Sequence, residues 1–208
     1  MEEKLNKSKY ILVGNSLSID FVNTLIAENG MPKDLLENLG DFVGWATVCG
    51  LIDKSEASDI LDNPREKGSE EKTLNEAKEF RKILLEVFKA ITKKKSVKQV
   101  LIEEINNYLK ENQGYTKLVQ NENEFSLIGD FKIETAKQIL VLIAKSIAGL
   151  LSEGDLSFIR KCESKECVLY FYDTTKNHRR RWCSNSACGN RAKAAAFYRR
   201  RKIKNNLN

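Results

Sequence analysis

Apolar residues in the first 155 positions recur at steps of three and four, which is the period of an amphipathic helix. The clearest run extends from Leu74 through Phe80 and Leu84 to Ile91. A later run over residues 134–151 is apolar on almost every side, so we expect it at the centre of a helical bundle. The pattern predicts helices over residues 18–29, 35–49, 55–61, 74–91, 97–109 and 134–151.

Short runs of strand-forming residues interrupt this helical pattern. Residues 8–13 are expected to form a strand, and residues 115–120 and 125–128 to pair as a β-hairpin around a polar turn. The polar stretch 152–155 is the best candidate for a domain boundary. No apolar stretch is long enough to span a membrane, since the longest, residues 139–151, has only 13 residues.

Positive charge is concentrated at the C-terminal end of the chain. The formal net charge is +6, but residues 160–208 carry 14 Lys and Arg against three acidic residues, whereas residues 1–159 carry 21 against 26. Eight of the ten Arg lie at or after position 160. A guanidinium group suits phosphate and guanine edges better than an ammonium group does. The distribution therefore indicates a nucleic-acid partner, with a merely solubilising tail as the alternative.

Four of the five cysteines lie in the same basic stretch. Cys162 and Cys167 form one pair with four residues between them, and Cys183 and Cys188 form a second, separated from the first by 15 residues. Clustered cysteines in a chain without an N-terminal apolar signal segment are more often metal ligands than disulfides. Zn²⁺ takes four thiolates in a closed tetrahedral shell. We therefore predict one Zn²⁺ per chain, with His178 as a bystander rather than a fifth ligand.

The sequence thus predicts two domains with different roles. Residues 1–155 are expected to form the helical domain, and residues 156–208 a treble-clef-like or ribbon-like four-cysteine zinc finger that ends in a basic helix. Residues 168–172 are expected to form the first strand of the hairpin that brings the two cysteine pairs together. The overall fold class is mainly α.

The basic helix is expected to follow the second cysteine pair directly. Gly189 is expected to adopt a positive φ and Asn190 to cap the helix. One side of the helix, with Ala192, Ala195, Ala196 and Ile203, is expected to pack against the zinc knuckle. A second basic cluster precedes Cys183, and the metal would hold the two clusters close together. The residues predicted to contact nucleic acid are Arg179, Arg180, Arg181, Arg191, Lys193, Arg199, Arg200 and Arg201.

Two segments resemble a known family. Residues 183–193, Cys-Ser-Asn-Ser-Ala-Cys-Gly-Asn-Arg-Ala-Lys, resemble the signature of the CGNR zinc-finger proteins, and residues 17–24, Leu-Ser-Ile-Asp-Phe-Val-Asn-Thr, resemble the opening of the ABATE domain that precedes this finger. The resemblance implies a bacterial, stress-induced transcription regulator whose finger binds DNA. Thr174-Thr175-Lys176 and Asn185 depart from the commoner family residues without removing a zinc ligand.

The N-terminal segment contains three polar residues that would share one face of a helix. Asp20, Asn23 and Thr24 stand at positions i, i+3 and i+4 beside apolar neighbours. They could line a pocket for an unknown small ligand, or they could satisfy backbone groups of neighbouring segments, and we favour the second interpretation. Cys49 stands alone in an apolar context and is expected to be buried.

Three classes of function compete at this stage. The first is a cytoplasmic, zinc-dependent regulator that binds duplex DNA, with an N-terminal domain that senses a ligand or mediates association, for example as a homodimer. The second is an RNA-binding or ribosome-associated zinc-ribbon protein, in which Tyr170, Phe171, Tyr172 and Trp182 would stack on exposed bases. The third is an enzyme, which we do not expect because the acidic residues form no recognisable catalytic constellation and the metal shell is closed.

Overall fold

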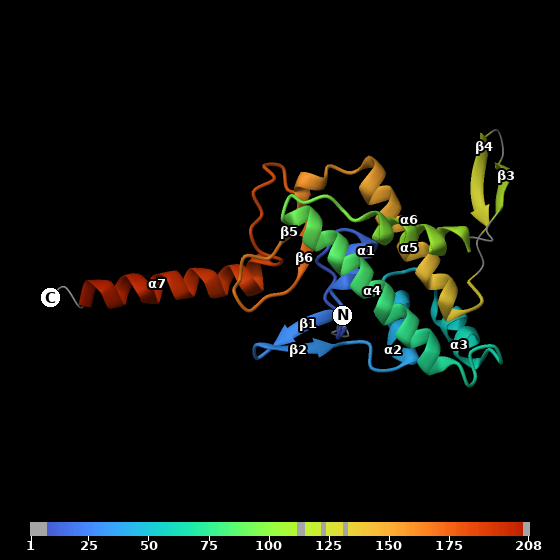
Figure 1. Ribbon diagram of the computed structural model, residues 1–208, viewed down its shortest axis with the longest axis horizontal. Helices are drawn as coiled ribbons and strands as arrows, with labels where there is room; N and C mark the ends of the chain where they lie inside the picture. Colours follow the sequence, from blue (N-terminus) through green and yellow to red (C-terminus); the bar gives the residue numbers. More distant parts are fainter. Residues whose placement is uncertain (1–7, 112–114, 122–123, 131–132, 206–208) are drawn as a thin grey trace.

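The computed structural model describes residues 8–111, 115–121, 124–130 and 133–205. The predicted mainly α fold is confirmed: a bundle of helices carries the cysteine-rich segment, from which the last helix projects (Figure 1). The helices of the bundle are α1 (Leu17–Val22), α2 (Leu39–Val48), α3 (Lys54–Asp62), α4 (Glu70–Thr92), α5 (Gln99–Lys110) and α6 (Ala136–Glu153). No helix in the described ranges is long and apolar enough to cross a membrane.

Helix α6 lies at the centre of the bundle and packs against α1, α2, α4 and α5. This confirms the position expected from its apolar pattern, and Leu140, Ile143 and Ile147 are fully buried. An aromatic group built on Phe21 and Trp45, whose ring centroids lie 5.2 Å apart, fills the space between α1 and α2. Helices α2 and α3 begin at capping boxes, in which an N-cap Asn or Asp side chain accepts a hydrogen bond from the third residue of the helix.

The N-terminal region differs from the prediction in two respects. Residues 8–13 form no regular strand. The helix predicted over residues 18–29 ends at Val22 and is followed by a β-hairpin of β1 (Leu25–Glu28) and β2 (Met31–Asp34). Asn29 and Gly30 both adopt positive φ, 52° and 78°, which is the geometry of a two-residue hairpin turn. The Asn-Gly pair therefore marks a hairpin turn, and the prediction of a helix end there was wrong.

The second hairpin is present where the sequence predicted it. Strands β3 (Tyr115–Asn121) and β4 (Glu124–Asp130) pair antiparallel and extend from the end of the molecule opposite to the last helix (Figure 1).

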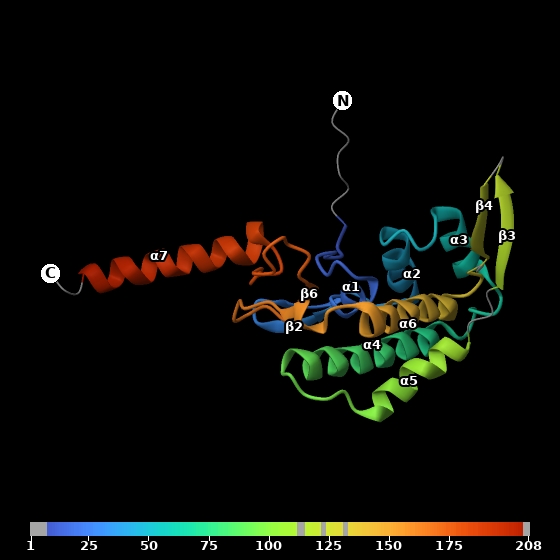
Figure 2. The same cartoon turned by 90° about the horizontal axis from the view of Figure 1, so that it is seen from above.

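The cysteine-rich segment begins with a short turn, η1 (Leu156–Phe158), and strand β5 (Ile159–Lys161). Strand β6 (Tyr170–Tyr172) follows β5 in the chain and pairs antiparallel with it. It is therefore the second strand of its hairpin, and the prediction that it would be the first strand was wrong. A π-helical turn, η2 (Asn185–Gly189), leads into helix α7 (Asn190–Asn205). Figures 1 and 2 show α7 projecting away from the bundle in both views.

Candidate metal centre

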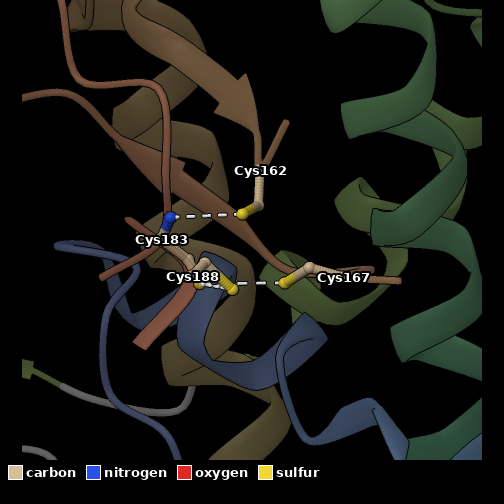
Figure 3. A group of neighbouring side chains, drawn as sticks. All are labelled: Cys162, Cys167, Cys183 and Cys188. Carbon is tan, nitrogen blue, oxygen red and sulfur yellow. Dashed lines mark hydrogen bonds between the residues drawn. The ribbon is translucent and has the colours of Figure 1, made fainter. Parts of the chain in front are cut away.

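The four cysteines of the C-terminal segment converge on one point (Figure 3). Their Sγ atoms all lie within 4.8 Å of one another. The Sγ of Cys183 lies 3.7 Å from that of Cys167 and 3.6 Å from that of Cys188. Cys162, Cys183 and Cys188 are buried and Cys167 is half-buried. No disulfide joins them.

This spacing fits a tetrahedral zinc ion. Four sulfur atoms at about 2.3 Å from a common centre are separated from one another by about 3.8 Å. The two Sγ–Sγ distances above are within about 0.2 Å of that value. Four thiolates are also the ligand set that Zn²⁺ prefers in closed structural sites. The residues present therefore fit one Zn²⁺, held by Cys162, Cys167, Cys183 and Cys188, as predicted.

Local backbone geometry sets the position of each sulfur. Cys162 follows β5, and its N–H donates to the carbonyl of Leu169, which extends the hairpin by one rung. The N–H of Cys183 donates to the Sγ of Cys162 at 3.4 Å, across the two cysteine pairs (Figure 3). The Ser184 side chain accepts from the N–H of Ala187 and so caps the turn that carries Cys188.

Two local predictions for the second cysteine pair were wrong. Gly189 does not adopt a positive φ. A Cβ added there would lie 3.5 Å from the Trp182 ring and 3.4 Å from the Asn185 side chain, which are ordinary contact distances. Asn190 has helical dihedral angles, φ −66° and ψ −40°, so it lies inside the continuous run of η2 and α7 and is not its N-cap. The N-cap of that run is Ser184.

The charge of the thiolates is partly balanced by neighbouring groups. The Arg191 guanidinium donates to the Sγ of Cys188 at 3.1 Å. A hydrogen bond from Cys183 lowers the pKa of the Cys167 thiol to about 5, whereas the same contact and burial raise the pKa of Cys183. Four thiolates and Zn²⁺ carry a net charge of about −2, so one adjacent guanidinium offsets part of that charge.

Asp173 organises the loop between β6 and the second cysteine pair. Its side chain is fully buried and accepts from the N–H groups of Thr175 and Arg180, at 3.1 and 2.8 Å. Burial alone would raise the pKa of Asp173, but these hydrogen bonds and the charge of Arg160 hold it below its ordinary value. His178 lies on this loop, with its ring stacked 3.7 Å from that of Phe158, and is not among the residues that surround the candidate metal position.

Asn23 connects helix α1 to the zinc-binding segment. Its side-chain amide donates to the carbonyl of Tyr170 and accepts from the N–H of Tyr170, both at 2.9 Å. The two bonds imitate a neighbouring β-strand, since Asn23 pairs with β6 as a backbone residue would. Asn23 is 1% exposed, so these bonds are shielded from water.

Asp20 and Thr24 are also engaged by neighbouring segments. The Asp20 carboxylate accepts from the N–H of Gly14 at 2.7 Å, and burial raises the pKa of Asp20 to about 6. Thr24 donates to the carbonyl of Phe21 and accepts from Arg81, which also pairs with Asp34 on β2. The contacts with Gly14 and Phe21 satisfy backbone groups, which is the interpretation that we favoured from the sequence over a ligand pocket.

Further contacts join the N-terminal segment to the finger, and sequence reasoning missed them. The N–H of Tyr172 donates to the carbonyl of Gly14, and the Asn15 side chain donates to the carbonyl of Tyr172. Val13 and Ile26 pack against the apolar cluster that surrounds the cysteines. In the sequence, only the polar residues of the segment from Asp20 to Thr24 indicated that the N-terminal segment contacts other parts of the chain.

The eight basic residues predicted to contact nucleic acid fall into two groups. Arg180, Arg181 and Arg191 are engaged within the protein. Arg180 donates to the carbonyls of Val13, Trp182 and Cys183 and lies over the Phe171 ring, whereas Arg181 pairs with Glu163. The members of the second group are exposed and make no side-chain hydrogen bond or ion pair with any residue that the structure describes: Arg179, Lys193, Arg199, Arg200 and Arg201. Arg181 and Arg191 are exposed as well, but each has such a partner.

Helix α7 makes little contact with the bundle. The prediction that its alanines pack against the zinc knuckle was wrong for Ala195 and Ala196, which are exposed, while Ala192 is half-buried. Phe197 and Tyr198 are 54% and 66% exposed. The first turn of the helix contacts η2, and the Phe197 and Tyr198 rings lie edge to face, with their centroids 5.7 Å apart.

Comparison with known protein families gives two matches, one over the helical bundle and one over the cysteine-rich segment. Residues 15–154 match the family described as "Putative stress-induced transcription regulator" (ABATE), and residues 159–201 match the CGNR zinc finger. A search of curated proteins gave no match.

Proposed function

We propose that this chain, which belongs to the ABATE family and ends in a CGNR zinc finger, is a transcription regulator that binds duplex DNA through α7. The observation that carries the proposal is the charge and exposure of this helix. Residues 190–205 contain seven Lys and Arg and no acidic residue. Such a helix matches the electrostatic footprint of a nucleic-acid-binding element.

The dimensions of α7 support insertion into a groove of the duplex. Its 16 residues span about 24 Å, and a B-DNA major groove accepts one α-helix. A helix of this length without tertiary support is marginal in water, so a polyanionic partner would stabilise it on binding. The metal centre fixes where the helix begins, because η2 carries Cys188 directly before it.

We propose that some of the exposed basic residues contact phosphates and provide affinity, and that others contact base edges and provide sequence preference. Lys193 and Arg199 to Arg201 would contact phosphates, with one or two of them reaching base edges. Arg179 would extend this surface from the loop before Cys183. Arg180, which the sequence placed in the same group, holds three backbone carbonyls of the protein, so its proposed role is to support the finger.

The test is a titration of the full chain with duplex DNA, measured by fluorescence anisotropy at several salt concentrations. The variant Arg199→Ala/Arg200→Ala/Arg201→Ala should bind all sequences more weakly, and the slope of log K against log salt should fall by about 0.9 for each phosphate that the variant no longer neutralises. The control removes three exposed lysines from the bundle, Lys54, Lys72 and Lys82. Equal affinity and salt slope in the two variants would refute α7 as the DNA-binding element.

Zinc dependence gives a second test of the same proposal. Chelation should remove one Zn²⁺ per chain and abolish DNA binding, because the base of α7 is held by η2 and by the contact between Arg191 and Cys188. If the chain still bound DNA with the same affinity after complete removal of zinc, DNA binding would not depend on the metal centre.

The RNA-binding alternative has weaker support. Of the four aromatic residues that would have stacked on bases, Tyr170 and Phe171 are buried, and Tyr172 and Trp182 are half-buried. An enzyme has weaker support too, since four thiolates leave zinc without an open coordination position for substrate. A strong preference for single-stranded RNA over duplex DNA at equal salt would reverse the first judgement.

A further inference from the structure

A groove of about 950 Å³ lies where the helical bundle meets the zinc-binding segment. One wall is the end of α4 and the loop that follows it, and the other wall is η1 and β5. Helix α4 packs against both η1 and β5, so the groove is formed by two parts of the chain about 60 residues apart. Its size is within the range of natural small-molecule sites.

The lining of this groove is strongly cationic. It contains six Lys and Arg side chains and a single acidic residue, Glu163. Three of the six are engaged by the protein: Arg160 lies beside Asp173 and donates to the carbonyl of His178, Arg180 holds backbone carbonyls, and Arg181 pairs with Glu163. The six basic residues are Lys94, Lys95, Arg160, Lys161, Arg180 and Arg181.

The other three cations are available to a ligand. The ammonium groups of Lys94, Lys95 and Lys161 make no hydrogen bond or ion pair with any residue that the structure describes, and all three side chains are exposed. Lys94 and Lys95 come from the bundle side and Lys161 from the finger side. A concave surface lined by charge of one sign concentrates counter-ions between its walls.

The floor of the groove is apolar and argues against a DNA backbone as its occupant. Ile91, Val97 and Leu156 are half-buried and Ile159 is buried, and all four line the groove. The sugar-phosphate backbone of a duplex presents charged phosphates and would make no apolar contact with these four side chains. No aromatic side chain lines the groove, so the successive unpaired bases of a single strand would find no row of stacking platforms.

We propose that this groove binds a small phosphate-bearing organic anion of nucleotide size. Its phosphates lie between Lys94, Lys95 and Lys161, and its apolar part lies on Ile91 and Val97. Because the ligand touches both walls, it stabilises the contact between the bundle and the finger that carries α7. The proposal goes beyond the DNA binding proposed above and does not depend on it.

The experiment is a titration of the full zinc-loaded chain with trinitrophenyl-ATP, a fluorescent nucleotide, in the absence of DNA. We expect saturable binding that unlabelled ATP displaces, and a higher midpoint of thermal unfolding with ATP present. The variant Lys94→Ala/Lys95→Ala should bind about 5- to 20-fold more weakly, as expected when two exposed cations no longer face the phosphates. The matched control, Lys72→Ala/Lys82→Ala, removes two exposed lysines from α4 outside the groove and should bind as the wild type does.

Charge reversal on the other wall provides an independent variant. Lys161→Glu should weaken binding, whereas Lys176→Glu, on an exposed loop of the same segment, should not. Circular dichroism of each variant without nucleotide confirms that it is folded. Displacement by tripolyphosphate as effective as that by ATP would show that the phosphate chain supplies the affinity, and displacement by ATP alone would show that the apolar floor contributes. Either outcome supports the site.

Three results would overturn the proposal. The first is the absence of saturable binding, or binding that ATP does not displace. The second is equal affinity in the Lys94→Ala/Lys95→Ala variant and its control. The third is displacement by duplex DNA together with weaker DNA binding in that variant, which would make the groove part of the nucleic-acid surface. Because the nucleotide titration contains no DNA, a negative result in it would not bear on the proposed role of α7 in DNA binding.

Discussion

Replacing Asn23 by Ala should weaken the attachment of the zinc finger to the helical bundle. The Asn23 amide makes two hydrogen bonds at 2.9 Å to the backbone of Tyr170, at a site that is 1% exposed. Alanine would leave one buried N–H and one buried carbonyl of Tyr170 without a partner. Each unsatisfied group costs about 1–3 kcal/mol, so we expect the free energy of unfolding to fall by about 2–6 kcal/mol.

The assay is urea and thermal unfolding of the full zinc-loaded chain, followed by far-ultraviolet circular dichroism. For a chain of this size, each kcal/mol corresponds to about 2–4 °C in the midpoint of thermal unfolding. Asn23→Asp keeps one acceptor but places a second acceptor against the carbonyl of Tyr170, so it should be at least as destabilising as Asn23→Ala. Asn177→Ala, at an exposed position on a finger loop, is the control and should have little effect.

The coupling between the two parts should also be visible at the metal. Tyr170 lies three residues after Cys167, so loosening β6 should speed the transfer of zinc to a chelator. An Asn23→Ala variant that unfolds within about 0.5 kcal/mol of the wild type would refute the reasoning. Unchanged stability together with abolished binding of a small molecule would instead favour the ligand-pocket interpretation of this segment.

Three further predictions concern the metal, the pH dependence and the finger loop. Cys188→Ser should lower the zinc content measured by native mass spectrometry from one per chain to a small fraction, and full occupancy would contradict a four-thiolate shell. Burial raises the pKa of Asp20 from 3.8 to about 6, so the carboxyl contributes about 3 kcal/mol of stability below about pH 4, which is lost as pH rises through 6. The stability of wild type relative to Asp20→Asn should therefore fall between about pH 4 and pH 7, and a flat difference would disprove the raised pKa. Arg180→Ala should destabilise the chain by about 1–3 kcal/mol, because three carbonyls lose their donor, whereas Arg179→Ala should be neutral; equal effects in urea unfolding would contradict the distinction.

Much of the fold was predictable because its signals are local. The period of apolar residues located the long helices α4, α5 and α6 to within a few residues, since one face of each helix is buried against the bundle. The hairpin at Asn29-Gly30 was also encoded locally, and it was missed because the apolar residues before it also fit a helical period.

The metal ligands were predictable from the sequence for a chemical reason. Thiolates at positions 162, 167, 183 and 188 can satisfy a tetrahedral ion only by converging, and few other arrangements of a short basic segment would bring four cysteines together. The direction of the β5–β6 hairpin was not predictable in the same way. Strand β6 could pair with a segment before or after it, and the apolar residues Ile159 and Tyr170, which join the core of the bundle, decide the choice.

The sequence by itself determined the helical periods, the zinc ligands and the concentration of basic residues at the C-terminal end, because each depends on residue type and short spacing. Only the tertiary structure decided which basic residues face solvent and which support the finger. Arg180 and Arg199 are the same residue type in similarly basic surroundings, yet one holds carbonyls of Val13 and Cys183 and the other is exposed. The bond between Asn23 and Tyr170 joins residues 147 positions apart, and no local pattern specifies a partner at that distance. Such contacts form only when burial of the shared core brings the two segments together.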